Sequence, residues 1–375
     1  MSRIKVLVVD DSVVVRRLVG DTLAGDPRLD VVGTAANGKV ALAKIPQLNP
    51  DLLTLDVEMP VMDGLETLRE VRRLYPRLPV IMFSTLTERG AATTLDALEL
   101  GANDYVAKPA NVGSVTASMA AVRSELVPKI LALCTRSRPV VPPSATPVPR
   151  RTDAPAAPAV PPRVDILAVG ASTGGPDALS VVLGALPASL PVPVVVVQHM
   201  PPVFTKQFAD RLNARCAVKV SEAVPGAPLV AGEVLIAPGD FHMRLRRVAG
   251  RVQATLDQGT PENYCRPAVD VLFRSAVEAY GGHVLGVVLT GMGADGARGS
   301  AEIVGAGGSV LVQDEATSVV WGMPGAVTAA GLAAKQLPLT GVAPAVLTRL
   351  AVGRRIGAPV TPLGPSRTGR TAWAT

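Results

Sequence analysis

The sequence predicts two α/β domains, each built on a parallel β-sheet. Short apolar segments alternate with helix-period segments in both halves of the chain, which is the pattern of strands connected by crossover helices. Hydrophobic residues make up 48% of the chain and aromatic residues only 3%, so the cores must be built from Val, Leu, Ile and Ala, as in buried parallel strands. With 375 residues the chain is long enough for two domains.

The first domain is predicted to span residues 1–130. It contains five strand-like segments, each followed by a helix-period segment. The strands are "KVLVVD", "DVVGTA", "DLLTLD", "PVIMFS" and "DYVAKP", and the helices are 12–25, 38–48, 64–75, 90–100 and 114–133. This order predicts a five-stranded parallel sheet with helices on both faces.

A composition change separates the two domains. Residues 131–163 are rich in Pro, Ala and Arg without apolar periodicity, so we expect a semi-extended linker. The second α/β pattern covers 164–352, and the tail 353–375 is predicted to be disordered. Strands are expected at "VDILAVG", "VPVVVVQH", "GEVLIAP", "HVLGVVLTG" and "GSVLVQD".

Charge does not indicate a nucleic-acid-binding protein, although the formal net charge is +6. Much of the excess lies in the predicted linker and tail rather than on one helical face, so we interpret it as solubilising charge. It includes Arg136, Arg138, Arg150, Arg151, Arg163, Arg354, Arg355, Arg367 and Arg370.

Cysteine spacing and hydropathy point to the cytoplasm. Cys134, Cys216 and Cys265 are scattered and form no Cys-x-x-Cys pair, so neither a disulfide framework nor a zinc site is expected. The N-terminus lacks the apolar core of a signal peptide, and no apolar run approaches the ~20 residues that span a bilayer. We therefore expect a cytoplasmic protein without membrane insertion.

Polar residues gather at the carboxyl ends of the first set of predicted strands, where parallel sheets bind ligands. Asp10 and Asp11 end the first strand, Asp56 the third and Ser84 the fourth, and Lys108 follows the fifth. Three converging carboxylates repel one another unless a hard cation such as Mg²⁺ joins them. Each Asp alone would be read as a helix cap, but the shared edge favours a phosphoryl-transfer site.

The motifs "VVDDS", "LTLDVEMPVMDG", "FST" and "DYVAKP" make residues 3–125 resemble the receiver domain of two-component response regulators, which has a flavodoxin-like fold. The resemblance implies that Asp56 is the phosphoacceptor. It also implies that Asp11, Asp56 and the backbone carbonyl of Glu58 hold Mg²⁺, with Asp10 supporting that site.

The same resemblance assigns the switch. Ser84, which stands where many receivers have Thr, would bind the phosphoryl oxygens, and Tyr105 would be the aromatic that changes orientation. Lys108 supplies a second positive centre beside the phosphoacceptor. A receiver performs no output chemistry, so the activity must lie beyond the linker.

The segment "GASTGGP" at 170–176 places Ser172 in a Gly-rich bend after a predicted strand. Its spacing fits neither the P-loop nor Gly-x-Gly-x-x-Gly, although a nucleotide cradle stays an alternative. A serine nucleophile needs a base and a residue that orients it. His199 ends the next strand and Asp295 follows a later one, so all three should meet at one rim.

Each partner has a simpler interpretation as well. His199 is equally placed to start a helix, and Asp295 to cap a helix that begins near Ala297. His242 and His283 have no comparable placement and are expected to be ordinary surface or core residues. Backbone N–H groups of "TGMGADG", especially that of Met292, are candidates for an oxyanion hole.

The motifs "GASTGGP", "VVVVQHM", "APGDFHM", "YCRPAVDVLF", "LTGMGADGARG" and "DEATSVVWGMPGAV" make residues 163–350 resemble the catalytic domain of the chemotaxis protein-glutamate methylesterases. The resemblance implies a doubly wound, Rossmann-like fold. It implies that Ser172 attacks the ester carbonyl, that His199 moves the proton, and that Asp295 fixes the imidazole. Thr173 and Met292 would line the site.

This resemblance also implies partners and regulation. The substrates would be glutamate γ-methyl esters, and often glutamines, of methyl-accepting chemotaxis receptors, and a chemotaxis histidine kinase would donate phosphate. Ester hydrolysis would need no cofactor, and the unphosphorylated receiver would obstruct the catalytic rim. We expect a monomer that binds no nucleic acid.

Two other kinds of output remain as alternatives, a DNA-binding module and a nucleotide-binding or noncatalytic scaffold module. The first would need a helix-turn-helix or a basic helix, whereas residues 164–350 offer strands and Gly-rich loops.

Overall fold

The first parallel sheet has the strand order β2-β1-β3-β4-β5 in the computed structural model, which describes residues 3–108, 115–135 and 162–354. Its strands are β1 (Ile4–Val9), β2 (Leu29–Ala35), β3 (Leu52–Asp56), β4 (Val80–Ser84) and β5 (Asp104–Ala107). Its helices are α1 (Val13–Ala24), α2 (Gly38–Leu48), α3 (Gly64–Leu74), α4 (Glu88–Glu99) and α5 (Val115–Cys134). This is the flavodoxin-like order, so the predicted five-stranded sheet is confirmed.

The second parallel sheet has the order β14-β13-β12-β6-β7-β9-β8. Its strands are β6 (Ile166–Ala171), β7 (Val194–Gln198), β8 (Lys219–Glu222), β9 (Glu233–Ile236), β12 (Val284–Val288), β13 (Ser309–Gln313) and β14 (Ala333–Leu337). Its helices are α6 (Gly175–Gly184), α7 (Pro202–Arg215), α8 (Val269–Tyr280), α9 (Ala297–Gly305), α10 (Met323–Ala329) and α11 (Leu339–Ala351).

The second sheet is doubly wound, and its winding places the site. The chain runs outward from β6 through β7, then returns to β12 on the other side of β6. Ligands bind at such a switch point because the loops that leave neighbouring strands diverge there. The loops after β6, β7 and β12 carry Ser172, His199 and Asp295.

Helices cover both faces of the second sheet. On one face α6, α7 and α11 bury apolar residues against the strands, and on the other α8, α9 and α10 do so. The helical face of α6 shows how the sequence produces this layer, because Leu179, Val182 and Leu183 recur at helical spacing and are fully buried. A helix that follows a buried parallel strand must hide one apolar face on that sheet.

Three features of the second half were missing from the predicted strands. The antiparallel hairpin of β10 (His242–Val248) and β11 (Arg251–Asp257) packs on α8, and β8 and β14 form the two edges of the sheet. Edge strands carry polar residues, as in "AAKQL" of β14, so they lack the apolar run that identifies a central strand.

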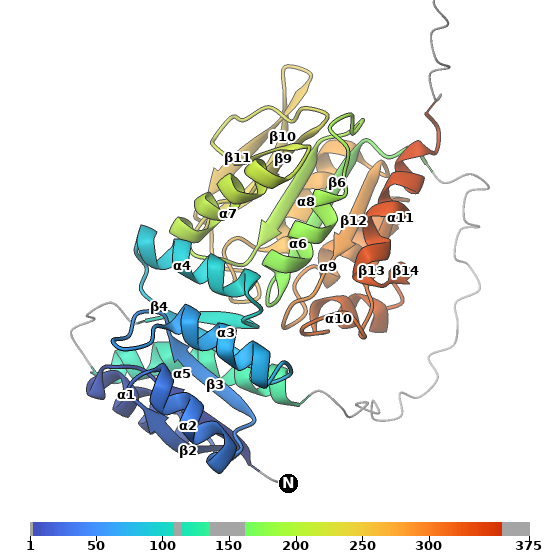
Figure 1. Ribbon diagram of the computed structural model, residues 1–375. Helices are drawn as coiled ribbons and strands as arrows, with labels where there is room; N and C mark the ends of the chain where they lie inside the picture. The colour runs from blue at the N-terminus through green and yellow to red at the C-terminus, as the bar shows by residue number, and fades with distance from the viewer. Residues whose placement is uncertain (1–2, 109–114, 136–161, 355–375) are drawn as a thin grey trace, which may run out of the picture.

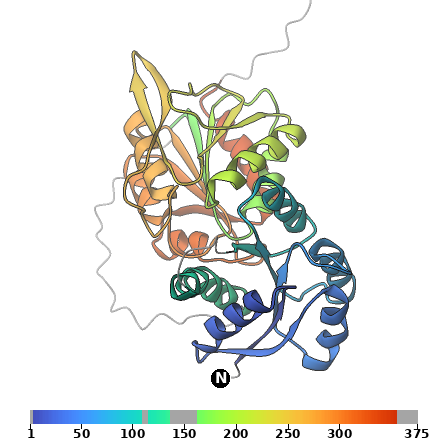
Figure 2. The same ribbon diagram turned by 90° about the vertical axis from the view of Figure 1, so that its left-hand side faces the viewer.

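The two halves pack against each other. Figures 1 and 2 show α4 of the first half beside α7 of the second, and one buried apolar cluster continues across the contact. The ring of Tyr105 on β5 stacks on that of Phe204 on α7, with centroids 4.6 Å apart and planes at 4°.

Two predicted segments fall mostly outside this structure. The predicted linker, apart from residues 131–135 and 162–163, and the predicted tail, apart from Gly353 and Arg354, lie outside the described residues. Across the described ranges, no helix combines the length and the apolar character needed to cross a bilayer.

Candidate active site

The acidic residues at the edge of the first sheet converge. Ligand oxygens of Asp10, Asp11 and Asp56 lie within 4.8 Å of one another, because β1 and β3 are hydrogen-bonded neighbours that end side by side. Asp10 and Asp56 are buried and Asp11 is exposed. A cavity of about 230 Å³ opens onto Asp11 and Asp56.

Lys108 joins the two buried carboxylates. Its Nζ lies 2.7 Å from Asp56 Oδ2 and 3.0 Å from Asp10 Oδ2. Burial raises the pKa of Asp56 to about 6, and Asp10 adds to this effect while the hydrogen bond from Lys108 opposes it. The cluster therefore holds more negative charge than one ammonium group stabilises.

This donor set fits a hard divalent cation. Carboxylate oxygens around an open cavity are the ligands that Mg²⁺ prefers, and its two charges would offset the repulsion that raises the pKa of Asp56. Glu58 lines the same cavity, and its side chain lies 3.7 Å from Arg89. The role of its backbone carbonyl stays a prediction.

Ser84 ends β4 as predicted, and its hydroxyl bonds to the start of α4. Ser84 Oγ donates to the carbonyl oxygens of Gly90 at 3.1 Å and of Thr85 at 3.2 Å. A phosphoryl oxygen at Asp56 would have to draw this hydroxyl away from α4, which links the acidic cluster to that helix.

The Gly-rich bend after β6 is a tight turn, and packing explains its glycines. Gly174 has φ +74°, and a Cβ there would lie 2.5 Å from Val319. A Cβ on Gly175 would lie 1.9 Å from the side-chain oxygen of Gln198, and the Gly175 amide donates to the carbonyl of Ser172 at 2.7 Å. The glycines therefore allow close packing around Ser172, and a phosphate cradle is not needed to account for them.

His199 and Asp295 meet, as the three-strand arrangement predicts. His199 Nε2 lies 2.8 Å from Asp295 Oδ2, and both side chains are nearly buried. Burial alone would lower the pKa of His199, but the hydrogen bonds to Asp295 and then to Cys265 outweigh it and raise that pKa to about 10. The imidazole is held firmly in one orientation.

Asp295 does not cap the helix that follows it. The N-cap of α9 is Gly296, without a side-chain capping bond. Asp295 instead accepts hydrogen bonds from the first two amides of α8, those of Val269 at 2.7 Å and Asp270 at 3.0 Å. The simpler interpretation of Asp295 as a cap of the helix near Ala297 is therefore wrong.

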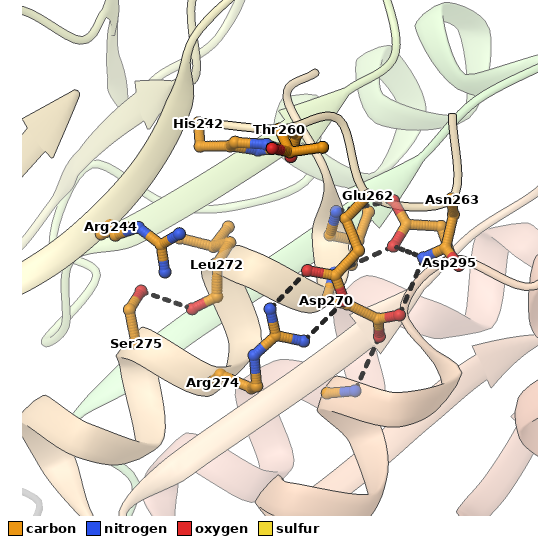
Figure 3. Close-up of polar contacts among 12 residues, drawn as sticks. His242, Arg244, Thr260, Glu262, Asn263, Asp270, Leu272, Arg274, Ser275 and Asp295 are labelled. Atoms are coloured by element: carbon orange, nitrogen blue, oxygen red, sulfur yellow. Dashed lines mark hydrogen bonds and ion pairs between the residues drawn. The ribbon is translucent and has the colours of Figure 1, made fainter. Parts of the chain in front are cut away.

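The N-terminus of α8 keeps Asp295 ionised. Burial raises its pKa, but the hydrogen bonds from His199 and from the α8 amides outweigh this and lower the pKa. The positive end of the helix dipole acts in the same direction. Figure 3 shows the side-chain amide of Asn263 between Asp270 and Asp295, donating at 2.9 Å to each carboxylate.

Ser172 and His199 border one small cavity of about 20 Å³. The opposite wall comes from the first half of the chain, with Asp104, Tyr105 and Lys129. This volume admits about one water molecule, so the residues of the first half leave little space beside Ser172 in this cavity.

Family models match both halves of the chain. Residues 6–120 match the response regulator receiver domain, and residues 167–346 match the CheB methylesterase. A relative from Nocardioides sp. (strain ATCC BAA-499 / JS614), named protein-glutamate methylesterase/protein-glutamine glutaminase, is 58% identical over 355 residues, covering 94% of this chain and 96% of the relative. The chain belongs to the CheB methylesterase family.

One further relative is similar over nearly the whole chain, and two solved structures are similar to one half each. A protein of the same name from Trichodesmium erythraeum (strain IMS101) is 51% identical and covers 93% of this chain and 100% of the relative. The crystal structure of the Thermotoga maritima CheB methylesterase catalytic domain is 41% identical, with a TM-score of 0.49, over 50% of this chain and 99% of that chain. The crystal structure of the response regulator domain of Thermotoga maritima CheB is 43% identical, with a TM-score of 0.31, and covers 34% of this chain and 93% of that chain.

Two further predicted residues, Thr173 and Met292, lie at the contact between the two halves. Thr173 is buried and lines the cavity beside Ser172, and its hydroxyl donates to Asp104 Oδ2 at 2.6 Å. Met292 packs against an apolar cluster that contains residues of the receiver together with Val320. The oxyanion role of Met292 stays a prediction.

Sequence reasoning missed several polar residues of the site. Asn263, Asp270 and Cys265 surround the His199–Asp295 pair, and Gln198 donates to the carbonyl of Ser172 at 3.0 Å. The signal for Gln198 was its place next to His199 at the end of an apolar strand. The others lie in the turn after β11 and in α8, and no strand-end rule points to them.

His242 and His283 lie apart from this cavity. His242 is buried on β10 and bonds to the carbonyl of Thr260 at 3.1 Å, while the half-exposed His283 bonds to that of Arg163 at 2.7 Å. Neither residue lines the cavity beside Ser172, and their interpretation as ordinary surface or core residues stays a prediction.

Proposed function

We propose that this protein hydrolyses glutamate γ-methyl esters on methyl-accepting chemotaxis receptors and releases methanol. The names of its full-length relatives support this substrate class and also support hydrolysis of glutamine side chains to glutamate. The observation that carries the proposal is the 2.8 Å contact between His199 and Asp295 on a cavity shared with Ser172.

Each side chain then has one chemical task. Ser172 Oγ attacks the ester carbonyl while His199 Nδ1 takes its proton, since Nε2 is bonded to Asp295. The imidazolium returns the proton to the departing methoxide oxygen, which leaves an acyl-enzyme and methanol. Water repeats the sequence and frees the glutamate. With glutamine the leaving group is ammonia.

Two neighbours are proposed to serve the tetrahedral intermediate. Thr173 lines the cavity next to Ser172, and the Met292 amide belongs to the loop after β12. One oxyanion donor typically lowers the barrier by about 2.7–4 kcal/mol.

The receiver is proposed to control access. Asp56 would accept the phosphoryl group from a chemotaxis histidine kinase, with Asp10, Asp11 and the Glu58 carbonyl completing the Mg²⁺ site. Bound Mg²⁺ would neutralise charge on the transferring phosphoryl oxygens. Lys108 Nζ, 2.7 Å from Asp56, would pair with the phosphoryl group once it is attached.

One short strand connects the two sites. Lys108 follows β5, and Asp104 begins it, so the residue that contacts Asp56 and the residue that bonds Thr173 are about 13 Å of extended chain apart. Tyr105, next to Asp104, stacks on Phe204. A change at Asp56 that moves Lys108 therefore acts directly on the contact that closes the cavity.

Ion pairs between α4 and α7 hold the closed arrangement. Arg211 Nη1 lies 2.7 Å from Asp96, and Arg215 Nη1 lies 2.6 Å from Glu99. The Gly90 carbonyl that accepts from Ser84 lies in the first turn of α4. Phosphorylation favours the open form only to the extent that the phosphoryl group binds it better than the closed one.

Methanol release from methylated receptor membranes tests the function. The full chain should release methanol, a small phosphodonor should accelerate it, and Ser172→Ala should abolish it. Equal release by the wild-type and Ser172→Ala chains would reject the proposed nucleophile and the proposed reaction.

A further inference from the structure

Cys265 places its thiol against the imidazole of His199. The distance from Cys265 Sγ to His199 Nδ1 is 3.5 Å, within range of a hydrogen bond to sulfur. The reaction sequence above gives this thiol no task. It contacts Nδ1, whereas Asp295 contacts the other ring nitrogen, Nε2.

Both ring nitrogens of His199 are thereby engaged. Nε2 contacts Asp295 at 2.8 Å, so Nδ1 is the nitrogen that must receive the proton of Ser172. A neutral ring accepts the weak S–H donor at Nδ1, and a protonated ring has no lone pair there. In either state the sulfur lies within hydrogen-bond range of the nitrogen to which the Ser172 hydroxyl must bond.

The turn that carries Cys265 is fixed from several sides. Glu262 and Cys265 exchange backbone hydrogen bonds at 3.1 and 2.9 Å, and Arg274 holds the Glu262 carboxylate (Figure 3). Asn263 and Tyr264 adopt φ of 53° and 64°, a left-handed conformation that persists only where surrounding contacts enforce it. The thiol position is therefore set by the turn.

We propose that Cys265 is a positioning residue whose thiol occupies Nδ1 of His199 in the resting protein, in competition with the hydroxyl of Ser172. This inference rests on the proposed function. The thiol is suited to the task because sulfur is a weak hydrogen-bond partner, as a donor to a neutral ring and as an acceptor from a protonated one, so a serine hydroxyl displaces it. A stronger hydrogen-bond partner at this position would hold the imidazole away from Ser172.

The electrostatics agree with this geometry. Burial lowers the pKa of His199, while Asp295 and then Cys265 raise it, and the two contacts prevail. A ring that stays protonated cannot accept a proton from Ser172. Asp104, Tyr105 and Lys129 are the ionisable residues that the receiver adds to the wall of the same cavity.

The test uses the full chain with Cys265→Ser and Cys265→Ala, assayed for methanol release without phosphodonor over a pH series. The Ser variant puts a hydroxyl at Nδ1, which is a stronger hydrogen-bond partner than the thiol for the neutral and for the protonated ring, so kcat should fall about five-fold. The Ala variant removes the competitor, so kcat should rise at neutral pH and the pH–rate profile should shift to lower pH. KM should stay the same in both.

Matched controls are Cys134→Ser and Cys134→Ala, in the receiver, where the thiol contacts the carbonyl of Asp51. Both should match the wild type. Rates of Ser172 labelling by a fluorophosphonate give a second readout, with the order Ala, then Cys, then Ser at position 265. Cys265→Val, also without a donor, replaces the Ala variant if that one unfolds.

The order Ala faster than Cys faster than Ser supports the proposal. Any other order overturns it, including equal rates for the Ser and Ala variants, which is the result a purely structural role gives. Failure of the proposed function is a separate result, because it requires that Ser172→Ala and the wild type release methanol equally.

Discussion

Replacement of Asp104 by Ala removes a hydrogen bond between the receiver and the loop of Ser172. Asp104 Oδ2 accepts the hydroxyl of Thr173 at 2.6 Å, and both residues are at least 94% buried. Asp104 Oδ1 also pairs with Lys129 at 3.1 Å, which fixes the carboxylate toward the interface. The substitution leaves the thiol, imidazole and hydroxyl of the second half unchanged.

The structure sets the magnitude of the effect. A hydrogen bond to a charged group contributes about 1.5–3 kcal/mol, and Thr173 loses its acceptor in the closed form only. A loss of about 2 kcal/mol changes the ratio of open to closed protein about 30-fold. Basal methanol release by the unphosphorylated Asp104→Ala chain should rise by up to this factor, limited by the rate of the fully open enzyme.

The assay compares initial rates of methanol release from methylated receptor membranes with and without a small phosphodonor. Asp104→Asn keeps an amide oxygen for Thr173 and should raise the basal rate much less. Arg73→Ala breaks only the Arg73–Glu70 pair on α3 and should not change it. Suppose that the basal rate of Asp104→Ala stays within about two-fold of wild type and that the phosphodonor still stimulates it. This result would refute the idea that the hydrogen bond between Thr173 and Asp104 holds the closed form.

Further predictions follow from the same geometry. Ser172→Ala should lose methanol release by a factor of about 10⁴ or more, and a smaller loss in steady-state assays would point to another nucleophile. Asp56→Ala should keep basal release yet ignore the phosphodonor; stimulation of that variant places the acceptor elsewhere. A fragment that starts at Arg163 should outpace the unphosphorylated full chain, and equal rates would contradict a blocked site. The pKa of His199, raised from 6.5 to about 10, means that basal release should climb as pH rises toward that value. The same shift means that the pair with Asp295 stabilises the fold fully below pH 6.5 and loses this contribution as pH rises through about 10. Thermal unfolding of Asp295→Asn against wild type over a pH series measures this, and a wild-type advantage that grows with pH would reverse the sign.

Most central strands were readable from the sequence because a buried parallel strand is a short, continuous apolar run. β6, β7, β9, β12 and β13 all coincide with such runs. The hairpin β10–β11 could not be read from the sequence in this way. Its strand "HMRLRRV" alternates apolar and charged residues and lies outside the main sheet. Its position on α8 depends on tertiary packing that no local period encodes.

Some residues of the site could be predicted from the sequence and others could not. The rule that side chains at the carboxyl ends of parallel strands meet was enough to bring Asp10 to Asp56 and His199 to Asp295. It did not reach Asn263 or Cys265, which come from a turn whose direction depends on two left-handed residues. The sequence also left open that Asp295 caps the helix that follows it. The fold shows that Asp295 instead accepts hydrogen bonds from the first amides of α8.

Local sequence patterns were sufficient to predict the two α/β halves and the strand-end residues, because periodicity and strand order are local properties with a fixed geometric consequence. The surroundings of those residues depend on the tertiary structure. The bond from Thr173 to Asp104, the stacking of Tyr105 on Phe204 and the sulfur at His199 Nδ1 each join segments far apart in the chain. Such contacts depend on how whole sheets and turns pack, and packing is a property of the assembled chain.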